Sequence, residues 1–136
     1  MKIGELAQRS GCAVETIRYY EKAGVLPAPP RTGSGYRDYT AGHMASLQFI
    51  RQCRALAMGL DDIRALIALQ EQPAAGCGSV DALVDQHIVT VDAQLASLQQ
   101  LRAQLVGLRG RCGEPGVVGE CAILRGLVTD GAKALA

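Results

Sequence analysis

Aromatic residues are scarce in this sequence of 136 residues, which has one Phe, no Trp and 4% aromatics, although 49% of its residues are apolar. A core must therefore come mainly from Leu, Ile, Val and Ala, which favours packed helices. The sequence also lacks a run of about 18 apolar residues and an apolar segment with a cleavage site near its start. We therefore expect a mainly α, soluble, cytoplasmic protein with no membrane partner.

Cysteine is present in an odd number, five, and histidine occurs only twice. In a reducing cytoplasm an odd cysteine count argues against a disulfide framework and favours metal or redox chemistry. The carboxylates show no pairing that would indicate acid–base catalysis, so we do not expect an enzyme.

Charge is distributed unevenly, although the net charge is only +1. Residues 1–58 hold eight Lys and Arg against four Asp and Glu, whereas residues 59–136 hold six against nine. A basic head on a mildly acidic body is typical of a protein in which one part meets a polyanion.

The segment IGELAQRSGCAVETIRYYEKAGVL (3–26) has helical apolar spacing, interrupted at Ser10 and Gly11. This pattern predicts a helix-turn-helix, whose second helix can enter a major groove about 12 Å wide. Arg18 and Tyr19 face away from the apolar side of that helix. An ordinary solvated helix is the alternative.

The next segment, RTGSGYRDY (31–39), has glycines between basic and aromatic residues and predicts a tight β-hairpin, or wing. Residues 40–58 then predict a helix with Thr40 as its N-cap, and residues 60–70 predict another. His43, near the start of the first of these helices, is expected at the surface.

The combination of TIRYYEKAGVL, a GYR wing and FIRQCRALAMGLDDIRALI resembles the amino-terminal domain of the MerR family of transcription regulators. The match covers residues 1 to about 71. The resemblance implies that DNA is contacted by Arg18, Tyr19, Tyr20, Tyr36, Arg37 and Arg54. Ala13 and Gly59 depart from the pattern, since each stands where the family often has a capping residue. Loss of such a cap lowers helix stability by about 1 kcal/mol.

A second pattern follows, in which Val84, Val91, Leu98 and Leu105 recur every seven residues. Ile88 with Leu95 and Leu101 with Leu108 fill the neighbouring rows. This predicts a coiled-coil helix over residues 80–111, about 48 Å long at 1.5 Å per residue. One small domain cannot cover such a helix, so we expect a second copy of the chain to pair with it.

Cys77 precedes this helix and Cys112 follows it, so within one chain the two thiols cannot share a ligand. Antiparallel pairing of two copies would bring Cys77 of one chain near Cys112 and Cys121 of the other, whereas parallel pairing would bring Cys77 beside Cys77. The residues leave the direction open, and the MerR resemblance implies the antiparallel one.

Three thiolates favour a soft or borderline ion. Structural zinc usually takes four protein ligands, and CGEPGVVGEC (112–121) has no further Cys or His, although Glu114, Glu120 or water could complete a zinc site. Lead(II) or mercury(II) suits three sulfurs, and cadmium(II) suits them with one added donor. A copper(I) site with two sulfurs would leave Cys77 unused.

A Cys before the long helix, a Cys after it and a closing Cys followed by AILRGL resemble the lead, cadmium and mercury sensing branch of the family. That resemblance implies a homodimer on double-stranded promoter DNA which, on binding a divalent soft metal ion, distorts the promoter for RNA polymerase. It favours Cd or Pb, then Hg, over Zn. A Hg(II) regulator, a two-thiol Cu(I) sensor and a redox sensor using Cys112 and Cys121 are the alternatives.

Three other residues could be ligands. Cys12 and Cys53 are expected to pack in the core. His87 is expected near the coiled-coil seam, with a secondary metal ligand as its alternative role. The resulting division is a winged helix-turn-helix head (1–71), a connector with Cys77 (72–79), the dimerisation helix (80–111), and a metal-binding loop, short helix and tail (112–136), in which residues 129–136 are expected to fray.

Overall fold

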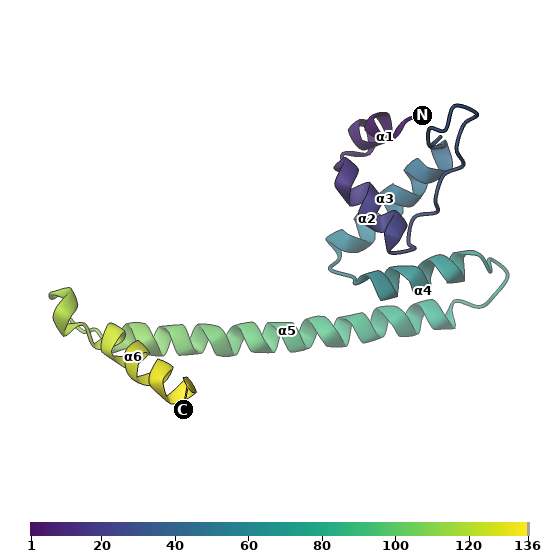
Figure 1. The fold of residues 1–136 in the computed structure, drawn as a ribbon. Helices are drawn as coiled ribbons and strands as arrows, with labels where there is room; N and C mark the ends of the chain where they lie inside the picture. The colour runs from purple at the N-terminus through teal and green to yellow at the C-terminus, as the bar shows by residue number, and fades with distance from the viewer. Residues whose placement is uncertain (136) are drawn as a thin grey trace. The chain divides into compact units, whose positions relative to one another are not determined.

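The computed structural model describes residues 1–135 and their side chains as far as residue 132. The chain divides into two compact units, Met1–Asp85 and a second unit that begins at Gln86, and each is described by itself. The regular elements of the described residues are helices (Figure 1). The predicted mainly α fold is confirmed.

The first two helices, α1 (Ile3–Ser10) and α2 (Val14–Lys22), form the predicted helix-turn-helix. Gly11 ends α1 with φ 72°, a left-handed conformation that glycine adopts without steric cost, and its N–H donates to the Ala7 carbonyl at 3.0 Å. Ala13, at the N-cap of α2, provides no side-chain hydrogen bond, as its sequence implies.

The wing is smaller than the predicted hairpin and consists of one antiparallel bridge between Arg31 and Arg37. The Thr32 N–H donates to the Tyr36 carbonyl at 2.6 Å, and the Asp38 N–H donates to the Pro30 carbonyl at 2.9 Å. Prolines have no N–H, so the ladder cannot continue through residues 29 and 30.

Helix α3 (Ala41–Ala55) starts at the predicted N-cap, but His43 is buried rather than at the surface. The backbone N–H of Thr40 donates to His43 Nδ1 at 3.0 Å, so the imidazole closes a capping box from the third helical position. The surface prediction for His43 was wrong because this hydrogen bond turns the ring inward.

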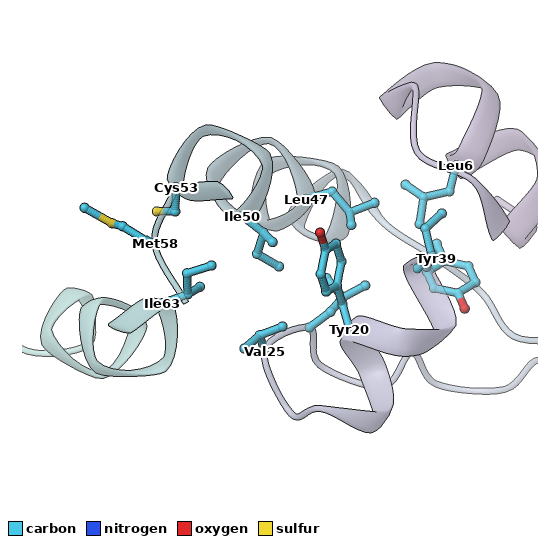
Figure 2. Close-up of a cluster of buried hydrophobic side chains, with 11 residues drawn as sticks. Leu6, Tyr20, Val25, Tyr39, Leu47, Ile50, Cys53, Met58 and Ile63 are labelled. Atoms are coloured by element: carbon cyan, nitrogen blue, oxygen red, sulfur yellow. The ribbon is translucent and has the colours of Figure 1, made fainter. Parts of the chain in front are cut away.

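The core of the first unit lies where α1, α2 and α3 meet the start of α4 (Leu60–Gln70) (Figure 2). Its side chains are almost wholly excluded from water, and burial of each large one stabilises the fold by about 1.5–3 kcal/mol. Cys53 is a member of this core and Cys12 packs partly against it, so both expectations of core packing are confirmed. Burial raises the pKa of the Cys53 thiol.

Helix α5 (Gly78–Gly110) is one uninterrupted helix of 33 residues, and none of its residues is fully buried (Figure 1). Many of the residues from the predicted seam have exposed side chains, namely Val84, Ile88, Leu95, Leu98, Leu101 and Leu105. A helix that leaves this much apolar surface in water is typical of a chain that pairs with another.

A loop containing the short 3-10 helix η1 (Val118–Glu120) connects α5 to α6 (Ala122–Leu135). Helix α6 is longer than the sequence suggests: the residues expected to fray are helical as far as Leu135, and residue 136 lies outside the described residues.

Candidate functional site

Three predicted DNA-contact residues come together in the first unit. Arg18 from α2 and Tyr36 and Arg37 from the wing line one cavity of about 250 Å³. Two arginines beside an exposed aromatic ring form a surface suited to phosphate and base contacts. Tyr19, also on α2, is 55% exposed.

Lys2 lines the same cavity, although no motif of the sequence assigned it to the DNA contacts. Its Nζ lies 4.7 Å from the centroid of the Tyr36 ring, within the range of a cation–π contact. Lys2 and Tyr36 are far apart in sequence, so no local pattern could have joined them.

Tyr20 and Arg54, the other two predicted contacts, have structural roles here. Tyr20 is 7% exposed and belongs to the core (Figure 2), which leaves little of it to reach DNA. Arg54 Nη1 donates to the Met58 carbonyl at 3.3 Å, just beyond the end of α3. Neither residue lines the cavity of Arg18.

Arg37 is held by an acidic partner on α2. Its Nη1 donates to Glu21 Oε2 at 2.5 Å. The pKa of Arg37 is raised by hydrogen bonding to Tyr39 and by the charge of Glu21. Its guanidinium, like that of any arginine, is charged at neutral pH. A permanent positive charge is therefore fixed at the edge of the cavity.

In the second unit, Cys112 and Cys121 line one cavity of about 440 Å³. Both thiols are half-buried, and no disulfide joins them. Gly113, Pro115 and Gly116 prevent α5 from continuing, and the chain turns so that its two cysteines face one space. The structure thus brings together two of the three predicted metal ligands.

Local hydrogen bonds fix each end of this loop. Arg109 Nη1 donates to the Cys112 carbonyl at 3.1 Å, and the Cys112 thiol donates to the Glu114 carbonyl at 3.4 Å. At the other end, Arg125 Nη2 donates to the Gly119 carbonyl at 3.3 Å. The two cysteines therefore lie where the loop leaves α5 and where it enters α6.

Cys77, the third predicted ligand, is exposed just before α5. Within the described residues, no three side chains of Cys, His, Asp or Glu are grouped closely enough to hold a metal ion. His87 is half-buried on α5.

In the part of the chain that the structure describes, none of the helices has both the length and the apolar character that a membrane span needs.

Two family models match the chain. The model described as "MerR HTH family regulatory protein" matches residues 1–70, and "MerR, DNA binding" matches residues 44–108. The chain belongs to the MerR family of transcription regulators. It is therefore a regulator and not an enzyme, as the sequence predicted.

Individual MerR proteins are similar over most of the chain. The transcription regulator PbrR691 from Ralstonia metallidurans CH34, solved in complex with lead(II), is 44% identical over 93% of this chain and 98% of its own, with a TM-score of 0.82. The "HTH-type transcriptional regulator ZntR homolog" of Haemophilus influenzae is 40% identical over 80% of this chain and 81% of its own.

The mercuric resistance operon regulatory protein of Bacillus cereus is also similar, with 33% identity over 93% of this chain and 96% of its own. This MerR-family chain is a heavy-metal-dependent regulator that binds DNA. Its relatives differ in their metals, so the comparisons leave its own metal open.

Proposed function

We propose that this regulator activates transcription from promoter DNA as a homodimer, and that Cd(II) or Pb(II) is its inducing ion. The observation that carries the proposal is the cavity shared by Cys112 and Cys121. Thiolates are the ligands that soft ions prefer, so the donor set of this cavity fits such an ion.

The third thiolate comes from Cys77 of the partner subunit. Within one chain, α5 separates Cys77 from Cys112 by 33 residues of helix, about 50 Å at 1.5 Å per residue. An antiparallel pair of α5 helices would instead join the start of one to the end of the other. The exposed apolar rows of α5 support such a pairing.

Similarity to PbrR691, whose solved structure contains lead(II), supports a large soft ion. Thiol ligands lose their protons on binding, so we expect the apparent affinity to fall in acid. The loop between α5 and α6 would become ordered as its two thiolates and Cys77 of the partner subunit close on one ion. That order would shift the regulator toward the conformation that distorts the promoter for RNA polymerase.

Two alternatives have support of their own. Similarity to the mercuric resistance regulator of Bacillus cereus favours Hg(II) as the inducer. The cavity itself contains two thiols, which also suits Cu(I) or a reversible disulfide.

For the DNA, we propose contacts from Arg18, Tyr19, Tyr36 and Arg37, with Lys2 added on the evidence of the shared cavity. Tyr20 and Arg54 stay sequence predictions, and so does His87 as a secondary metal ligand.

The experiment is an anaerobic ultraviolet titration of the reduced dimer with lead, cadmium, mercury, zinc and copper(I), followed by sulfur-to-metal charge-transfer bands. We expect lead or cadmium to bind one ion per protomer, and Cys77→Ser to lose this tight binding. Cys12→Ser is the matched control, because its half-buried thiol lies in the first unit and does not line the thiol cavity.

Unchanged lead and cadmium binding by Cys77→Ser would remove the intersubunit ligand and favour a two-thiol site. A preference for mercury, lost in the same variant, would keep the site and change the inducer. Loss of binding in Cys12→Ser as well would mean that substitution of a thiol disturbs the fold rather than the site.

A further inference from the structure

The carboxylate of Glu21, in the last turn of α2, is almost fully buried against the wing. Its side chain is 7% exposed. Oε2 accepts a hydrogen bond from Arg37 Nη1 at 2.5 Å, and Oε1 accepts one from the Tyr39 hydroxyl at 2.5 Å. Each oxygen thus holds a different residue of the segment that follows the wing turn.

Tyr39 forms the rigid side of this arrangement. It is 2% exposed, and its ring lies edge-on to that of His43 at 5.3 Å between centroids. Burial and the hydrogen bond to Glu21 raise the pKa of Tyr39, so its hydroxyl keeps the proton that it donates. The position of the carboxylate is therefore set by the core.

Arg37 forms the outer side. Its side chain is 42% exposed, and it lines the cavity that also contains Arg18 and Lys2. A guanidinium has five N–H donors, so one bond from Nη1 to Glu21 leaves others for a second acceptor. Glu21 therefore determines where the remaining donors of Arg37 lie.

We propose that Glu21 is a positioning residue for DNA binding, whose carboxylate holds the Arg37 guanidinium in place to meet a phosphate. This inference rests on the proposed contact between Arg37 and DNA. A carboxylate near a polyanion ordinarily weakens binding by repulsion. Here we expect the opposite, namely that loss of the Glu21 carboxylate weakens DNA binding, because the Arg37 side chain is then no longer held in place.

The test measures the affinity of the full-length wild-type dimer and of its variants for one operator duplex. This duplex is first selected from a randomised library by the wild-type protein. We expect Glu21→Gln to weaken operator binding about tenfold. The dependence of log affinity on log salt concentration should also become less steep by about 0.9, the amount that corresponds to one lost phosphate contact. Glu21→Asp, which keeps the charge but is one methylene shorter, should also weaken it. Thermal unfolding and metal stoichiometry report whether each variant is folded.

The sign of the change decides the outcome. A Glu21 that acts only as a charge would give tighter binding in Glu21→Gln and wild-type affinity in Glu21→Asp, and either result overturns the inference. In an Arg37→Ala background, Glu21→Gln should have no further effect on affinity, because the side chain that it positions is absent.

Glu5→Gln is the matched control, since Glu5 forms only an exposed ion pair with Arg9 on α1. This variant should bind DNA with wild-type affinity. Normal affinity in Arg37→Ala would remove the proposed DNA contact itself. Weakened binding in Arg37→Ala with normal binding in both Glu21 variants would remove only the positioning role.

Discussion

At the scale of single residues, burial sets the chemistry of Tyr39. Its pKa is raised above the ordinary value, chiefly by burial and also by the hydrogen bond to Glu21. The unfolded chain therefore loses the phenolic proton at a lower pH than the folded chain. The stability that this proton contributes is complete below about pH 10, the pKa of an unperturbed tyrosine, and is lost as pH rises through the folded value.

Replacing Tyr39 with Phe should therefore flatten the alkaline part of the stability curve. We expect the melting temperature of the wild-type regulator to fall more steeply above about pH 10 than that of Tyr39→Phe. The Cys53 thiol, whose pKa is also raised, contributes equally to both proteins. Scanning calorimetry from neutral pH upward measures the two slopes, and parallel slopes would contradict the assignment.

At the scale of elements, one side chain of α4 holds the end of α2, in addition to the core that the two helices share. Arg64 donates to the Ala23 carbonyl from Nε at 2.9 Å and from Nη2 at 2.6 Å, and its Nη1 pairs with Asp61 at 2.6 Å. Ala23 caps the C-terminal end of α2, where carbonyls lack partners within the helix. Arg64 thus stabilises the end of the proposed recognition helix from a distant element.

Removal of this side chain should destabilise the first unit measurably. We expect Arg64→Ala to lower the free energy of unfolding by about 1–2 kcal/mol in urea, and Arg64→Lys to recover little of it, because an ammonium cannot reproduce the two-pronged bond. Arg9→Ala, which removes an exposed ion pair on α1, is the control and should cost well under 1 kcal/mol. Equal losses in the two alanine variants would make the contact to α2 irrelevant.

The helices were predictable because their signals are local. Apolar residues repeat along α1, α2 and α5, and Gly11 and the Gly and Pro residues after Cys112 mark where helices stop. The small wing and the buried His43 were not predicted, since they depend on prolines that block a ladder and on an imidazole that caps its own helix.

The candidate site was predictable to the extent that it lies on one segment. Cys112 and Cys121 flank a short loop, and both line one cavity. Lys2 beside Tyr36 and Glu21 beside Tyr39 depend on how distant segments pack, and a single sequence carries no signal for either pair. Tyr20 shows the converse, since the family resemblance assigned it to DNA while packing places it in the core.

For the whole molecule, the outer surface of α5 poses a clear test of dimerisation. Leu98 belongs to the heptad row and is 61% exposed in the single chain, and Val89 is nearly as exposed, at 58%. Nine residues at 3.6 per turn place these two on opposite sides of the helix. The two positions are therefore matched in exposure and differ in the side of the helix that they occupy.

A charge at Leu98 should separate the subunits. We expect Leu98→Glu to sediment as a monomer at concentrations where the wild-type regulator is a dimer, because it would bury an unpaired carboxylate in the interface. Val89→Glu should leave the dimer intact. If both variants dissociate, or neither does, the proposed seam is misplaced.

Because the apolar rows of α5 are exposed in the single chain, the stability of the fold should depend on how many copies of the protein a cell contains. When two chains must meet before those leucines leave water, assembly is second order, and the unfolding temperature of the proposed dimer rises with protein concentration. A cell that holds few copies would keep a larger share of them as single chains with a solvated long helix. The supply of DNA-binding regulator would then fall faster than the amount of protein synthesised.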